Sequence, residues 1–167
     1  MNVFVCHQDP VLAAKYLCDR HVVKMVLESA QLLSTVCAEK GLDFEGRYKS
    51  THKGHPCVIA MKNDSNYLNW VSQHGFALAF EYSNRFHKIH KSLDVIHDAS
   101  LVLIQEKLMP GKFDLMEIES FPKAVFDEFK NLPVVEAYQK HLAKKYLELW
   151  KPNEAKWTKP GIKPNWL

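Results

Sequence analysis

The sequence lacks the long apolar runs, the leader and the paired cysteines that are typical of membrane and secreted proteins. Its longest apolar runs fall far short of the roughly 20 residues that a membrane-spanning helix needs. No basic segment followed by an apolar one opens the chain. Its four cysteines have no CxxC spacing, and three of them lie inside apolar segments. These absences predict reduced, buried thiols, a soluble protein and a cytoplasmic location.

Internal repeats and low-complexity segments are also missing, and a chain of 167 residues is about one domain long. Apolar residues make up 47% of the chain and charged residues 25%, a composition that excludes a disordered protein. The net charge of +3 permits a polyanionic partner without requiring one. We expect a single helical domain over residues 1–150 and a basic, aromatic tail over 151–167, packed on that domain or extending from it.

Helix signals dominate the first 150 residues and predict a mainly α fold, a compact helical bundle. Residues 1–6 are β-branched and aromatic, which favours a short N-terminal β-strand. Asp9 and Pro10 form an N-cap and first-turn pair, so a helix is predicted from there to about residue 17. A second helix is predicted to reach about Glu39, with Gly41 just beyond its end. Asp64 or Ser65 is expected to cap a third long helix.

A stripe of polar residues lies along the helix predicted over residues 19–39. His21, Lys24, Glu28 and Gln31 fall near one azimuth, whereas apolar residues cover most of the remaining circumference. Such a helix is packed on several sides, so the stripe must be paired internally or face a cleft. Two interpretations stay open: a catalytic stripe, and a structural Lys24–Glu28 pair.

A second polar stripe follows the helix predicted from about residue 65 to about residue 90. It comprises Asn63, Tyr67, His74, Glu81 and Arg85. The mixture of an imidazole, a phenol, a carboxylate and a guanidinium indicates a functional face. A solvent-exposed surface is the alternative, because polar stripes on amphipathic helices usually face water.

The last 17 residues hold four lysines, two tryptophans and three prolines. The prolines exclude a helix there. Lysines interleaved with aromatic rings suit a phosphate backbone and unstacked bases. The alternative is a strap whose tryptophans, Trp157 and Trp166, insert into the core.

The run from Leu17 to Glu28 resembles the phage-type pyrimidine-dimer DNA glycosylase/AP lyases. In that superfamily a short strand leads to a helix bearing Asp-x-His, with the catalytic glutamate seven residues after the histidine, and Asp19, His21 and Glu28 have this spacing. The chain also resembles, more weakly, the His-Pro, His-Glu and Arg spacing of short bacterial relatives, through His55-Pro56, His74, Glu81 and Arg85. The chain also resembles small uncharacterised phage proteins, so a host-cytoplasmic location would follow if a phage encodes it.

The resemblance implies base removal from DNA, with strand cleavage as a possible second step. In the family an N-terminal α-amine attacks C1′ and the glutamate stabilises the developing oxocarbenium ion. It implies Glu28 as the essential carboxylate, His21 and Lys24 as its positioning or phosphate-binding partners, and Met1 as the source of the amine. No cofactor and no metal is expected. The candidate substrate-binding residues are Asn2, Gln31, Tyr48, His52, His55, Tyr67, Trp70, His74, Glu81 and Arg85, with Arg85 on a phosphate and Tyr48, Tyr67 or Trp70 holding an extruded base.

Two departures from the family pattern limit that expectation. Asn2 is too bulky for efficient removal of Met1, so the amine would be that of Met1 and displaced by one residue. The family's arginines beside the glutamate are absent, and Lys24 is the candidate replacement. Without an amine, Glu28 would activate water, as in a monofunctional glycosylase or a nucleoside hydrolase.

Two other classes of function compete with this one. A non-catalytic nucleic-acid-binding or protein-binding phage factor would use the stripes only to order its fold. A metal-dependent hydrolase would use ligands drawn from His52, His55, Cys57, His87 and His90, whose His-x-x-His spacings are tolerable for a metal.

Overall fold

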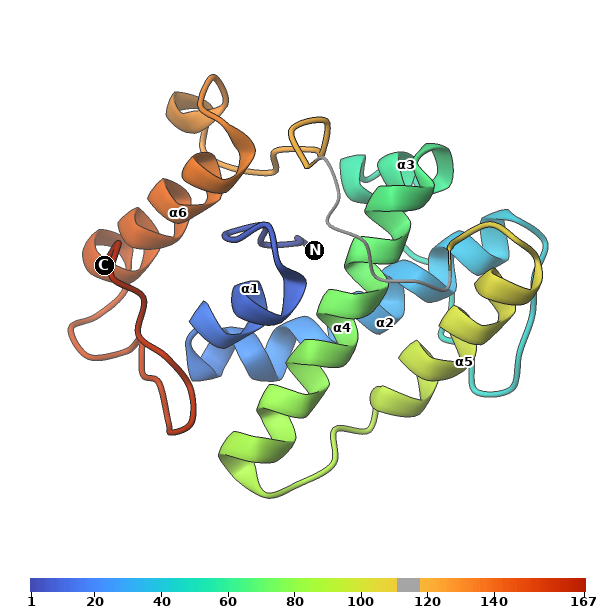
Figure 1. The fold of residues 1–167 in the computed structure, drawn as a ribbon, viewed down its shortest axis with the longest axis horizontal. Coiled ribbons are helices and arrows are strands. Elements are labelled where there is room, and N and C mark those ends of the chain that lie inside the picture. Colours follow the sequence, from blue (N-terminus) through green and yellow to red (C-terminus); the bar gives the residue numbers. More distant parts are fainter. Residues whose placement is uncertain (111–117) are drawn as a thin grey trace.

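The computed structural model describes residues 1–110 and 118–167, and within these ranges the protein is mainly helical (Figure 1). The helices are α1 (Pro10–Tyr16), α2 (Asp19–Glu39), α3 (Pro56–Asn63), α4 (Ser65–Phe86), α5 (Leu93–Gln105) and α6 (Val134–Lys144). A 3-10 turn, η1, covers Asp127–Phe129, and a π-helical turn, η2, covers Lys145–Leu149. Within the described ranges, no helix is both long and apolar enough to cross a bilayer.

Local sequence signals set the starts and ends of several helices. The Asp9 carboxylate accepts hydrogen bonds from the backbone of Val11 and Leu12, which confirms the predicted cap of α1. Asp64 caps α4 in the same way through Asn66 and Tyr67. Helix α4 stops at Phe86, short of the predicted end near residue 90, because His87 adopts a left-handed conformation with φ of 54°.

Two predicted elements differ in the structure. The N-terminal segment is extended but pairs with no strand among the described residues. Its backbone donors are satisfied elsewhere: Asn2 N–H bonds the Glu28 carboxylate, and Val3 N–H bonds the Asn2 side chain. The prediction of a β-strand is therefore wrong, because side-chain oxygens accept the backbone hydrogen bonds that a partner strand would accept. The sequence also predicts a short helix over 122–131, and the structure forms only the 3-10 turn η1 there.

The core forms where α2, α4 and α5 cross. A Cβ atom added at Gly75 of α4 would lie 3.1 Å from Ser29 Cβ of α2 and 3.3 Å from Ile96 Cδ1 of α5. The absence of a side chain at Gly75 thus lets the three helices approach closely. Helix α1 also packs against α4.

The N-terminal segment lies between α2 and α6 (Figure 1). The Asn2 side chain donates to the Ala124 carbonyl at 2.8 Å, and Tyr138 of α6 accepts from the Ala124 backbone at 3.1 Å. Gln139 of α6 donates to the Cys6 carbonyl at 3.1 Å. These contacts fix the first residues of the chain between the two helices.

The tail lies against the domain in the structure. Asp19 N–H donates to the Lys156 carbonyl at 2.8 Å, and the Trp157 indole donates to the Tyr16 carbonyl at 2.9 Å. Thr158 donates to the Asp19 carboxylate from its backbone and from its hydroxyl. Trp157 therefore holds the tail against the domain, as in the strap alternative.

Gly161 is where the tail passes closest to the domain. A Cβ there would lie 2.6 Å from Arg85 Cζ and 2.8 Å from the Thr158 carbonyl, whereas a Cβ at Gly54 would meet nothing within 4 Å. Gly161→Ala is expected to lower the free energy of unfolding by about 1–3 kcal/mol through this overlap. Denaturant unfolding of the two variants measures the difference. Equal stability of Gly161→Ala and Gly54→Ala would contradict the close contact.

Candidate active site

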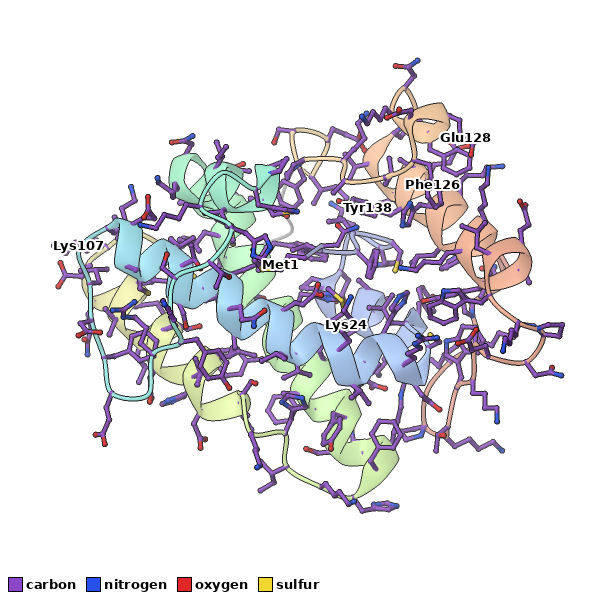
Figure 2. All side chains as sticks on the ribbon, turned by 180° about the vertical axis from the view of Figure 1, so that it is seen from behind. Met1, Lys24, Lys107, Phe126, Glu128 and Tyr138 are labelled. Atoms are coloured by element: carbon purple, nitrogen blue, oxygen red, sulfur yellow. The ribbon has the colours of Figure 1, made fainter. Side chains whose placement is uncertain are left out.

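A cavity of about 240 Å³ opens between the N-terminal segment, α2 and α6. Figure 2 shows Met1 and Lys24 near one another on this side of the molecule. The cavity brings the only carboxylate of the first polar stripe together with the amino terminus and with residues of α6 and η2. It is lined by Met1, Asn2, Phe4, His21, Lys24, Met25, Glu28, His141 and Lys145.

Glu28 is 7% exposed and lies in the wall of this cavity. Its Oε2 accepts a hydrogen bond of 2.9 Å from the Asn2 backbone, and its Oε1 lies 3.1 Å from Lys24 Nζ. The Lys24 side chain is 64% exposed, so this ion pair contributes little free energy and Lys24 can swing away toward a ligand. The carboxylate is thus held in place from one side and remains accessible from the other.

His21 is surrounded by aromatic rings. Its ring centroid is 4.7 Å from that of Phe4, 5.2 Å from Tyr146 and 5.1 Å from Trp150. A hydrogen bond of 2.6 Å joins His21 Nδ1 to the Tyr146 hydroxyl. Burial, followed by the positive charges of Lys145 and Lys24, lowers the pKa of His21 to about 2. The imidazole is therefore neutral at pH 7, so we interpret His21 as a positioning group that ties α2 to η2.

Acid should destabilise the protein through His21. Unfolding raises its pKa from about 2 to the ordinary value of 6.5, so stability falls as the pH drops through that window. The loss between pH 7.5 and pH 5 is about 2 kcal/mol for this group. Urea unfolding at both pH values should show a loss of stability that is about 2 kcal/mol smaller in His21→Phe than in the wild type and in His97→Phe, whose histidine is exposed, because His74 and His141 keep their own contributions. An unchanged pH dependence in His21→Phe would contradict the assignment.

The amino terminus lies at the same cavity. Met1 and Asn2 both line it. The pKa of His55 lies below its ordinary value, because burial and the nearby terminal amine disfavour its charged form. A hydrogen bond to the Met1 backbone and the charge of Glu28 act in the opposite direction. His55 also caps α3 by accepting from Cys57 N–H at 3.2 Å. His55 is thus placed beside the terminus, at the edge of the site that α2 supports.

The wall opposite α2 comes from α6 and η2, and sequence reasoning did not identify it. His141 is 8% exposed and accepts a hydrogen bond of 3.3 Å from Phe126 N–H. Burial and the charge of Lys145 lower the pKa of His141 to about 4. Lys145 Nζ lies 5.5 Å from the Phe4 ring centroid and 5.8 Å from that of Trp150. Lysines occur in the basic tail and also in the last helix that the sequence predicts, which begins near Pro133, and the sequence alone does not show which of them reach the cavity.

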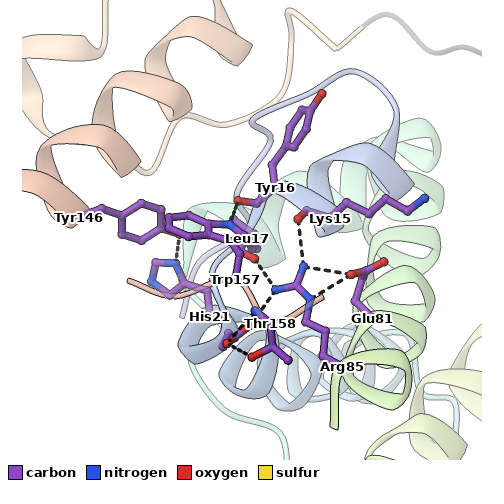
Figure 3. Close-up of polar contacts among 10 residues, drawn as sticks. Lys15, Tyr16, Leu17, His21, Glu81, Arg85, Tyr146, Trp157 and Thr158 are labelled. Atoms are coloured by element: carbon purple, nitrogen blue, oxygen red, sulfur yellow. Dashed lines mark hydrogen bonds and ion pairs between the residues drawn. The ribbon is translucent and has the colours of Figure 1, made fainter. Parts of the chain in front are cut away.

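Arg85 does not line this cavity, contrary to its predicted phosphate role. Its side chain is fully buried, and its guanidinium bonds the carboxylates of Glu81 and Asp19 at 3.0 and 3.1 Å (Figure 3). It also donates to the carbonyls of Leu17 and Lys15 at 2.8 and 2.9 Å. Because these acceptors occupy its nitrogens, Arg85 serves the fold. Glu81 belongs to the same network and does not line this cavity.

Tyr67 and His74 of the second stripe lie in the core and not on a surface, and so does Trp70, which precedes His74 by one turn of α4. Each is at most 1% exposed. Trp70 donates to the Gln8 carbonyl at 2.8 Å, and its ring stacks on His74 at 4.7 Å. His74 donates to the Pro10 carbonyl at 3.0 Å. Neither interpretation of this stripe, as functional face or as solvated surface, fits Tyr67 and His74, and none of the three residues is exposed to an extruded base.

The remaining predicted residues lie outside the cavity. Gln31 is half-buried one turn beyond Glu28. The Tyr48 hydroxyl bonds the Ser92 hydroxyl at 3.0 Å, which directs it toward the start of α5. His52 is exposed in the loop before α3. Among residues 1–110 and 118–167, no three His, Cys, Asp or Glu side chains gather as metal ligands would, so the metal-dependent alternative gains no support.

One comparison with known proteins found a match. A family model described as pyrimidine dimer DNA glycosylase matches residues 1–95, which contain Met1, Asn2, His21, Lys24 and Glu28 but not His141 or Lys145. No curated protein matches the chain. No solved structure matches it either. Because the family model spans more than half of the 167 residues, the chain belongs to the pyrimidine dimer DNA glycosylase family.

Proposed function

We propose that the protein cleaves the N-glycosidic bond of a damaged or modified base in DNA, with Glu28 as the essential carboxylate. The observation that carries the proposal is the position of Glu28. Its carboxylate lies in a cavity beside the amino terminus and accepts a hydrogen bond from the Asn2 backbone. Membership of a DNA glycosylase family supports the same reaction.

The chemistry of this bond explains why a fixed carboxylate is needed. As the base leaves, positive charge develops on C1′ and O4′ of the sugar, and a nearby carboxylate stabilises that charge. The Asn2 hydrogen bond fixes the orientation of Glu28 before the substrate arrives, so little reorganisation is needed. The exposed Lys24 is the group of the site that is free to bind a flanking phosphate.

Strand cleavage at the resulting abasic site would need an amine. The family resemblance implies the chain's terminal α-amine, and Met1 lines the cavity. The nitrogen in contact with Glu28 is that of Asn2, which is a peptide amide while Met1 is present. An AP lyase step is thus a separate part of the proposal from base removal.

A screen of duplex oligonucleotides tests the proposal. Each duplex carries one lesion: a cis-syn thymine dimer, an oxidised base or an alkylated base. Base release is measured as alkali-labile strand breaks, for the wild type, Glu28→Gln and the matched surface variant Glu45→Gln. Release by the wild type and Glu45→Gln alone is expected. DNA binding without release from any lesion would favour a non-catalytic binder.

A further inference from the structure

We propose that His141 donates a hydrogen bond from its Nε2 atom to the carbonyl oxygen of the departing base that lies next to the glycosidic nitrogen. This inference rests on the proposed function and deepens it, because it assigns the group that stabilises the leaving base. His141 belongs to α6, outside the residues 1–95 that match the family model. It lines the same cavity as Glu28.

The hydrogen bond that His141 makes in the fold determines which ring nitrogen carries its proton. The backbone N–H of Phe126 donates to Nδ1 at 3.3 Å, and a backbone N–H can only donate. Nδ1 therefore carries no proton, and the proton of the neutral imidazole lies on Nε2. Burial and the charge of Lys145 lower the pKa of the ring to about 4, so it is neutral at pH 7. His141 thus offers an uncharged N–H donor.

This Nε2 donor has no partner in the fold, and it is not sealed in the core. Among residues 1–110 and 118–167 no acceptor bonds it, and it is not one of the fully buried polar atoms that lack a partner. His74 gives the contrast: its Nδ1 bonds the Pro10 carbonyl at 3.0 Å, and its Nε2 is sealed and unpartnered. Because His141 lines the cavity, its donor is available to a ligand there.

Aromatic neighbours hold the imidazole in position. Its ring centroid is 4.4 Å from that of Phe126 and 6.0 Å from that of Phe4. Phe4 is also 4.7 Å from His21 of α2, so one ring of the N-terminal segment neighbours both walls of the cavity. The donor is therefore oriented before a ligand arrives, which is what makes a hydrogen bond effective against developing charge.

The two walls of the cavity suit the two fragments of a breaking glycosidic bond. The C1′–N bond breaks with its electron pair on the base nitrogen, so the sugar becomes positive and the base negative. Glu28 on α2 suits the sugar, and the N–H of His141 on α6 suits the base. A nucleophile, water or an amine, then bonds C1′, and the proton that it loses neutralises the base anion. His141 keeps its own proton throughout.

The chemistry of the base indicates where this donor has the largest effect. Negative charge on N1 of a pyrimidine spreads to the adjacent O2, and a hydrogen bond to O2 strengthens as that charge grows. When the 5,6 double bond is saturated, as in a cyclobutane dimer, O2 is the only carbonyl oxygen conjugated with N1. The donor of His141 is thus best matched to saturated pyrimidines.

Two substitutions separate the roles of the two ring nitrogens. His141→Asn puts an amide oxygen near the position of Nδ1, where it can accept from Phe126 N–H, and removes the donor at Nε2. His141→Gln extends an amide N–H to the Nε2 position. His97→Asn, at an exposed histidine, is the matched control. Glycosidic-bond cleavage in a thymine-dimer duplex should be about 10²–10³-fold slower in His141→Asn, about tenfold faster in His141→Gln than in His141→Asn, and unchanged in His97→Asn.

Nitrogen-15 NMR of the histidine-labelled wild type gives a readout that depends on neither turnover nor a variant. In the free protein the Nδ1 of His141 should have the shift of an unprotonated nitrogen, and Nε2 that of a protonated one. The probe is a duplex whose dimer carries a 2′-fluoro sugar, which resists cleavage. Its binding should move the Nε2 proton downfield, whereas an undamaged duplex should not.

Three results would overturn the inference: a proton on Nδ1, an Nε2 signal that the dimer duplex leaves unmoved, or cleavage by His141→Asn within about threefold of the wild type. Failure of the proposed function looks different, because the wild type then cleaves no lesion. Cleavage by the wild type with an unmoved Nε2 signal rejects the role of His141 and retains the glycosylase. A dimer-specific movement of that signal without cleavage retains the contact of His141 with the base and rejects the glycosylase.

Discussion

Replacing Arg85 with methionine is expected to lower the free energy of unfolding by about 3–5 kcal/mol. The guanidinium is fully buried between the carboxylates of Glu81 and Asp19 and the carbonyls of α1. Methionine fills much of the space but donates no hydrogen bond. The Glu81 carboxylate, 5% exposed, would then be left buried without its counter-ion. The tail would also loosen, because Asp19 joins Arg85 to Thr158.

Denaturant unfolding of Arg85→Met and Arg47→Met measures this difference. Arg47 pairs with Asp43, whose side chain is 80% exposed, so its loss should cost less than about 1 kcal/mol. Arg85→Met should unfold at a clearly lower denaturant concentration. Equal stabilities would mean that the Arg85 network does not hold the tail and α1 on α4.

The sequence predicted the helices well because their signals are local. Asp9-Pro10 and Asp64 act on donors within three residues, and the α2 periodicity depends only on spacing. The stripe that contains Glu28 was identified for the same reason. The Lys24–Glu28 pair of the structural interpretation exists in the structure, and it lies at a cavity and not in a sealed core, so the catalytic interpretation stays a prediction.

The second stripe shows where local reasoning stops. Spacing places Tyr67, His74 and Arg85 on one face of α4 but does not say what covers that face. The N-terminal segment and α1 cover it: Arg85 bonds Leu17, 68 residues away in sequence, and His74 bonds Pro10, 64 residues away. Lys145 was missed for a similar reason, since only folding brings η2 to the amino terminus.

Glu28→Gln is expected to slow base release by about 10²–10⁴-fold while leaving the fold intact. Glutamine has the shape of glutamate, and its side-chain oxygen can still accept the Asn2 hydrogen bond. It carries no charge to stabilise the cationic sugar. Loss of the exposed Lys24 pair should change stability by less than about 1 kcal/mol.

Single-turnover cleavage of one glycosidic bond in a duplex with one cis-syn thymine dimer, measured as alkali-labile strand breaks because the cyclobutane ring retains the detached base, tests the central claim most directly. The wild type and Glu45→Gln should cleave that bond at the same rate, and Glu28→Gln should be slower by the factor given above at an unchanged melting temperature. Release by Glu28→Gln within about tenfold of the wild type, or none by the wild type, would contradict the role assigned to Glu28.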